Sequence, residues 1–176
     1  LEALRNVITA ANVYEQVAAH GLPSLFEMLE EDVRGPAGFT YTKDAEVLEL
    51  RGLSLEVITA IAPNELCANA MANTGHLGTL IHLLRSNVKD ARNAVLNIML
   101  ALSASSGVVA EMLRLGCIVD LLHFLCADEA TAGDKPSRVA AARVLSKFVS
   151  DNRKGSQAMV DLQRFMPEGL ALLLKE

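Results

Sequence analysis

The sequence predicts an all-helical fold built from repeated units of three helices. Apolar residues make up 51% of the 176 residues, aromatic residues only 4%, and Trp is absent. The apolar content is therefore mainly Leu, Ala, Val, Ile and Met, which pack well between helices and lose little rotamer freedom there. The second observation is an internal repeat, in which a short amphipathic stretch, a glycine, an apolar run and a longer amphipathic stretch recur along the chain.

The repeat is visible in three segments that align through a glycine and a leucine. They read HGLPSLFEMLEE (20–31), TGHLGTLIHLLRS (74–86) and LGCIVDLLHFLCA (115–127). A fourth copy, FMPEGLALLLKE (165–176), keeps the leucine and lacks the glycine. We expect the glycine to end the first helix of each unit, because a left-handed residue there lets the chain turn sharply. The glycines concerned are Gly21, Gly75 and Gly116.

The spacing of the aligned leucines identifies the kind of repeat. Leu80 and Leu121 lie 41 residues apart. The neighbouring spacings are longer, and the excess falls on segments 32–44 and 128–136, which are rich in Gly, Pro and charge, as loops are. A period near 41 residues with three helices per unit is typical of armadillo repeats. The sequence therefore predicts an all-α, armadillo-type (ARM/HEAT-like) right-handed superhelical solenoid.

We interpret residues 1–176 as a single armadillo-like repeat domain. The prediction divides it into an orphan third helix (1–11), three complete units (12–62, 64–106 and 107–151) and an incomplete last unit (152–176). Because the chain begins with Leu1 and not with Met, we expect it to be a fragment of a larger protein.

Composition also limits the class of partner and the compartment. The net charge of −5 makes the phosphate backbone of a nucleic acid an unfavourable partner. The three cysteines form no C-x-x-C pair, which favours the reducing cytoplasm. Segment 67–84 carries no Asp, Glu, Lys or Arg, but its Asn, Thr and Gly residues favour a pair of buried solenoid helices over a membrane span.

Candidate catalytic and metal-binding residues are few. His123 and Cys126 share a helix face, and Cys67 and His82 could meet across a helix pair. Zinc requires four ligands at recognisable spacing, so we interpret these residues as core cysteines and half-buried histidines. The GPAG stretch (35–38) lacks the Lys and Ser/Thr of a phosphate-binding loop. We therefore expect no enzyme activity, no metal and no cofactor.

A partner-binding surface is predicted from the alignment of the long helices, because the third helices of armadillo units line the concave face. Members of each aligned pair are four residues apart and project from one side of their helix. The pairs run from acidic, through apolar, to basic, which could fix the direction of a bound segment. They are Glu2/Asn6, Gly52/Glu56, Val95/Met99 and Arg143/Lys147.

Four segments of the sequence resemble a known family. They are LEALRNVITA (1–10), LELRGLSLEVITAIAPNELCANAMANTGHLGTLIHLLRS (48–86), EMLRLGCIVDLLHFLC (111–126) and SRVAAARVLSKFVSDNRKGSQAMVDLQRFMPEGLALLLKE (137–176). In this order they are similar to the C-terminal armadillo-like region of receptor-mediated endocytosis protein 8, a family of large endosomal J-domain proteins. A J-domain acts through a His-Pro-Asp tripeptide, which these 176 residues do not contain.

The resemblance implies a non-catalytic, protein-binding scaffold segment that works in endocytic trafficking and receptor recycling. It implies a cytoplasmic protein held peripherally on early endosomes by parts outside this fragment. The partners it implies are sorting nexin, retromer or other endosomal coat machinery, and a heat-shock-cognate chaperone reached only through a J-domain elsewhere in the protein.

The alternative is a generic armadillo scaffold or peptide carrier of another class, such as an import carrier. Import carriers resemble one another in a ladder of Asn on the long helix, with a Trp one turn earlier. In this sequence the ladder position reads Asn6, Glu56, Met99 and Lys147, and Trp is absent. The sequence therefore disfavours an import carrier.

Overall fold

The computed structural model describes residues 11–31, 45–85, 89–126 and 135–151. Within these ranges the chain is helical and contains no strand. The elements are α2 (Ala11–Gln16), η1 (Val17–Gly21), α3 (Leu22–Glu31), α4 (Ala45–Ile61), α5 (Glu65–Asn73), α6 (His76–Leu84), α7 (Lys89–Leu102), α8 (Ser106–Arg114), α9 (Cys117–Cys126) and α10 (Lys135–Asp151). The orphan helix expected over 1–11 lies outside the described residues except for Ala11, which begins α2, and the incomplete unit expected over 152–176 lies outside them entirely. The division into units stays a prediction.

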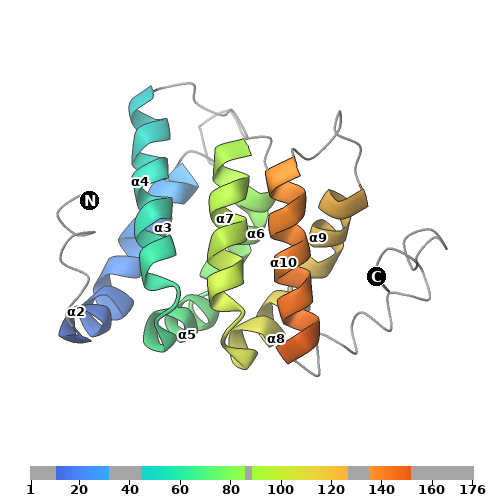
Figure 1. The fold of residues 1–176 in the computed structure, drawn as a ribbon. Helices are drawn as coiled ribbons and strands as arrows, with labels where there is room; N and C mark the ends of the chain where they lie inside the picture. The colour runs from blue at the N-terminus through green and yellow to red at the C-terminus, as the bar shows by residue number, and fades with distance from the viewer. Residues whose placement is uncertain (1–10, 32–44, 86–88, 127–134, 152–176) are drawn as a thin grey trace.

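The three long helices, α4, α7 and α10, lie side by side in chain order and form one layer (Figure 1). Helix α7 packs against both of the others. Each long helix also packs on the helix before it: α4 on α3, α7 on α6 and α10 on α9. Segments far apart in the sequence therefore meet mainly along the long helices.

A continuous hydrophobic core runs through the described helices, from Val17 to Phe148. The apolar residues of each helix recur three or four positions apart, so they share one face and are removed from water together. In α7 this face carries Ala91, Val95 and Met99, all of which are buried. Burial of each large apolar side chain contributes roughly 1.5–3 kcal/mol. The core therefore fixes which face of each long helix is left for a partner.

Gly75 and Gly116 confirm the predicted turn between the first and second helix of a unit. Both have φ of 80°, in the left-handed region that side chains with a Cβ disfavour. The carbonyl of each glycine accepts a hydrogen bond from the amide three residues later, at 3.0 Å for Gly78 and 3.1 Å for Val119. A sharp turn thus begins the next helix directly.

Gly21 departs from this prediction, which is wrong at that position. The chain does not turn there but passes through the π-helical segment η1, and the Leu22 amide donates to the carbonyl of Val17, five residues back. Pro23 lacks an amide hydrogen, so it cannot donate to the preceding turn. The wider π turn accommodates this loss without ending the helix.

Segment 67–84 forms two helices. The chain turns at Thr74 and Gly75 between α5 and α6, and both helices bury their apolar faces in the core. Asn64 caps α5 by accepting hydrogen bonds from the amides of Leu66 and Cys67, at 3.1 and 3.3 Å. Of the helices described, none is long and apolar enough to cross a membrane.

Candidate functional site

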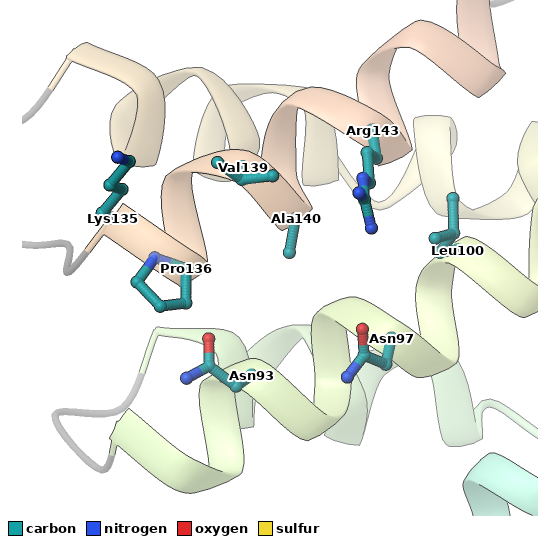
Figure 2. Close-up of a pocket in the computed structure, with 8 residues that line it drawn as sticks. All are labelled: Asn93, Asn97, Leu100, Lys135, Pro136, Val139, Ala140 and Arg143. Atoms are coloured by element: carbon teal, nitrogen blue, oxygen red, sulfur yellow. The ribbon is translucent and has the colours of Figure 1, made fainter.

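An open groove of about 530 Å³ lies between two of the long helices, α7 and α10. Its walls are shown in Figure 2 and comprise Asn93, Asn97, Leu100, Lys135, Pro136, Val139, Ala140 and Arg143. The first three come from α7 and the other five from α10. The groove therefore exists only where these two long helices pack together.

Helix α7 presents two amides to this groove. Asn93 and Asn97 are four residues apart and therefore point to the same side of the helix, opposite the buried Val95 and Met99. Figure 2 shows both side chains directed across the groove towards α10. The Oδ1 atom of Asn93 accepts a hydrogen bond of 2.8 Å from the hydroxyl of Ser137, whose side chain is buried in α10. This bond holds one amide in place, while Asn97 is exposed.

Helix α10 presents two cations to the same groove. Lys135 lies at its first turn, and Arg143 lies about two turns later near Asn97 (Figure 2). Both are exposed. In the part of the chain that the structure describes, neither cation of the groove has a carboxylate partner. The wall residues that the structure describes therefore carry two positive charges and no negative charge.

The predicted concave strip is only partly reproduced. Arg143 lines the groove, and Glu56 is exposed on α4. Lys147 is half-buried on α10 and lies outside the groove walls. The positions of Glu2 and Asn6 fall outside the described residues.

The middle of the strip requires a correction, because Val95 and Met99 lie in the core. Their relative exposures are 0% and 1%, so neither side chain is available to a partner. The buried stripe of α7 matches that of α4 in a register that places Asn93 and Asn97 beside Gly52 and Glu56 on the outer face. The prediction was two residues out of register on this helix.

Sequence reasoning therefore missed Asn93 and Asn97. A signal for them was present: in DARNAVLNIMLAL (90–102) the two amides lie four apart between apolar residues that follow a helical period of their own. The prediction instead took the exposed positions of this helix from the alignment between repeats, which assigned Val95 and Met99 to the exposed face.

Cys67 and Cys117 do not form reactive sites. Cys67 and Cys117 are fully buried, and burial raises the pKa of both thiols. For Cys117 burial and the nearby charge of Asp120 raise the pKa to about 12. The Cys67 thiol donates to the carbonyl of Tyr14 at 3.6 Å. Both thiols stay protonated near neutral pH, and the thiol form is a poor nucleophile.

The interpretation of the two histidines as half-buried is confirmed for His82 and is wrong for His123. His123 is exposed, and the Cys126 side chain lies outside the described residues. His82 is half-buried on α6. Among the described residues, no group of three or more His, Cys, Asp or Glu is placed to hold a metal ion.

Comparison with known proteins gives one line of evidence on identity. No model of a protein family matches the sequence. The chain is 25% identical over 122 residues to the DnaJ homolog subfamily C protein GRV2 of Arabidopsis thaliana. The match covers 69% of this chain and 5% of the relative, so the chain spans a small part of that protein's length. The chain is thus similar to a short stretch of a protein named as a DnaJ homolog.

Proposed function

We propose that this chain is a non-catalytic, protein-binding segment of an endosomal J-domain co-chaperone of the receptor-mediated endocytosis protein 8 family. The similarity to a DnaJ homolog supports the co-chaperone connection. The parallel layer of α4, α7 and α10 supports an armadillo-type solenoid, in which such a layer is the partner-binding side. In this proposal the segment binds sorting nexin or retromer components, and the J-domain elsewhere in the protein recruits the chaperone.

The observation that carries the proposal is the groove between α7 and α10. It is open to solvent, it lies between two long helices, and the described polar side chains of its walls are two amides and two cations. These groups bind hydrogen-bond partners and anions, whereas general acid–base catalysis usually employs His, Glu or Asp. The described residues of the groove walls include no His, Cys, Asp or Glu. Its composition therefore suits recognition better than catalysis.

The proposal is tested by filling the groove. Val139 is 45% exposed on the α10 wall, and Val139→Trp would place an indole in the groove without adding charge. Val119→Trp is the matched control, because Val119 is 61% exposed on α9 and outside the groove. Binding of purified sorting nexin and retromer subunits to the chain is measured by biolayer interferometry.

We expect Val139→Trp to abolish binding of the true partner and Val119→Trp to leave it unchanged. Circular dichroism and denaturant unfolding establish that both variants keep the fold. Equal binding by the two folded variants would remove the groove as the binding surface. If the unmodified chain bound none of these endosomal proteins, the endosomal assignment would be wrong.

A peptide carrier of another class is the second candidate, and Asn93 with Asn97 is the observation that favours it. In the register of the structure, the long helices present Glu56, Asn97 and Arg143 at equivalent positions. One Asn in three, without any Trp, is a weak match to the ladder of import carriers. Lys135 and Arg143 would also repel a basic targeting peptide. Tight binding of such a peptide would favour the carrier.

A further inference from the structure

The hydrogen-bonding groups of the groove between α7 and α10 are mostly donors. Lys135 offers three N–H donors and Arg143 five, and neither offers an acceptor. The oxygen of Asn93 already accepts the Ser137 hydroxyl, so the free atoms of this amide are mainly its two N–H donors. Of the two amides among the described wall residues, only that of Asn97 has an oxygen that accepts no hydrogen bond from another described residue. A ligand that fits must supply acceptors.

The charge of the groove points to the same chemistry. Both cations are exposed and unpaired within the described part of the chain, although the chain as a whole has a net charge of −5. Arg binds a carboxylate through two parallel hydrogen bonds, which gives geometric specificity as well as affinity. The favoured acceptor is therefore a carboxylate.

The positions of the cations limit the spacing of the carboxylates. Lys135 and Arg143 are eight residues apart on one helix, which corresponds to a rise of about 12 Å. An extended chain covers about 12 Å in four residues, and residues four apart point to the same side. The two amides lie along the opposite wall, with Asn97 facing Arg143 and Asn93 nearer to Lys135 (Figure 2). An extended segment along the groove would therefore place its backbone within reach of Asn93 and Asn97.

We infer that the groove binds an extended acidic segment of a partner protein, with two carboxylates four residues apart. One carboxylate pairs with the Arg143 guanidinium and the other with the Lys135 ammonium. The amides of Asn93 and Asn97 bind the backbone of the segment between them. This inference rests on the proposed function, because it names the chemistry of the partner at the same groove.

The test uses short labelled peptides as probes and fluorescence anisotropy as the measurement. The first peptide carries two Glu four residues apart in a Ser/Ala background. In the second the Glu are adjacent, in the third both are Gln, and in the fourth both are Lys. We expect the first peptide to bind about tenfold or more tightly than the Gln peptide, since charge-assisted hydrogen bonds are lost. The adjacent-Glu peptide should fall between these two, and the Lys peptide should bind least.

Variants of the protein locate the binding. We expect Arg143→Glu to weaken the first peptide about tenfold or more, and Arg143→Lys less, because Lys retains the charge without the two-bond geometry. Asn97→Ala should weaken all peptides by a similar factor of roughly three to ten, since it removes a backbone contact. Arg138→Glu is the matched control: it makes the same change of charge on α10 outside the groove walls.

Three outcomes would overturn the inference. They are equal binding of the Glu and Gln peptides, equal losses in Arg143→Glu and Arg138→Glu, and competition by single-stranded DNA as effective as that by the acidic peptide. The proposed function has a separate readout. If Val139→Trp abolished binding of an endosomal partner while the acidic peptide did not bind, the inference would fail and the proposed function would stand.

Discussion

Three helix joints contain a glycine: the first, between α2 and α3, at Gly21, the second, between α5 and α6, at Gly75, and the third, between α8 and α9, at Gly116. The first of these joints differs from the other two. At Gly75 and Gly116 the chain turns through a left-handed residue and starts a separate helix. At Gly21 it continues from α2 into α3 through the π-helical turn. Pro23 accounts for the difference, because it removes an amide hydrogen two residues after Gly21. The comparison teaches that a glycine marks a joint in the repeat without determining its backbone geometry.

The contacts that join α3 to α6 and α6 to α9 also differ from each other, in the kind of interaction. Between α3 and α6, the rings of Phe26 and His76 stack with centroids 4.1 Å apart and an interplanar angle of 7°. Between α6 and α9, Arg85 donates two hydrogen bonds to Asp120, at 2.8 and 2.9 Å. The first contact is aromatic, and the second is ionic and partly exposed. Variants at these joints should therefore differ in size and in sensitivity to solution conditions.

We expect the largest loss of stability from a substitution at Phe26, which forms the aromatic contact between α3 and α6. Its side chain is 1% exposed, so Phe26→Ala leaves a cavity in the core. We expect the free energy of unfolding to fall by about 3–5 kcal/mol. Urea unfolding followed by circular dichroism measures this change. Phe26→Leu is the control and should cost less, because it keeps most of the volume; equal losses would indicate that packing volume is not the cause.

The third joint carries a buried thiol directly after its glycine, which makes stability there depend on pH. Burial, with the charge of Asp120, raises the pKa of Cys117 from 9.0 to about 12. Below 9.0 the thiol is protonated in the folded and the unfolded chain, so its contribution to stability is intact. Above that value the unfolded chain loses the proton first, and stability falls by up to about 1.4 kcal/mol per pH unit.

Denaturant unfolding at neutral pH and at several higher values measures this slope. Other groups also titrate in the alkaline range, so the comparison is between the chain and Cys117→Ala. We expect the variant to be less stable at neutral pH and to lose stability less steeply as the pH rises. Identical slopes would contradict the assignment of the alkaline loss to Cys117.

The joints also separate what the sequence predicts from what it does not. Gly75 and Gly116 were predicted to turn in the left-handed region, because the repeat places each of them between two apolar helices. Gly21 was predicted in the same way, but the hydrogen bonds around Pro23 depend on one residue that the other repeats lack. A pattern shared by repeats thus predicts shared geometry and misses local exceptions.

The candidate site was predicted less completely than the fold. The apolar period of the long helices was recognised, and Arg143 was assigned to the exposed face. Asn93 and Asn97 were missed because loops of unequal length leave the register between repeats undetermined. The face of a helix is decided by its own buried stripe, which in α7 includes Val95 and Met99. Register within a helix is therefore a better guide to a binding face than alignment between repeats.

Substitution of the three glycines tests the first comparison directly. An added Cβ at Gly75 or Gly116 would meet no atom within 4 Å, so the cost of Ala there is backbone strain alone. We expect Gly75→Ala and Gly116→Ala each to lower the free energy of unfolding by about 1–2 kcal/mol.

Gly21→Ala should have the opposite sign. The backbone there is helical, and the nearest atom to an added Cβ is Cγ1 of Val17 at 3.4 Å, an ordinary contact. Ala should stabilise the chain by up to about 1 kcal/mol, because it loses less backbone freedom than Gly on folding. Urea unfolding of the three variants measures both signs. A loss at Gly21 equal to that at Gly75 would mean that the first joint also requires a left-handed residue.

The smallest effect is expected for the ion pair between α6 and α9. The Arg85 side chain is 55% exposed and that of Asp120 is 16% exposed, so solvent screens much of their attraction. A double-mutant cycle with Arg85→Ala and Asp120→Ala should give a coupling of about 0.2–1 kcal/mol that decreases at high salt. The same cycle across Phe26 and His76 should depend less on salt, because stacking of the two rings does not require opposite charges. Equal salt sensitivity of the two cycles would show that the aromatic and ionic contacts do not differ as the geometry indicates.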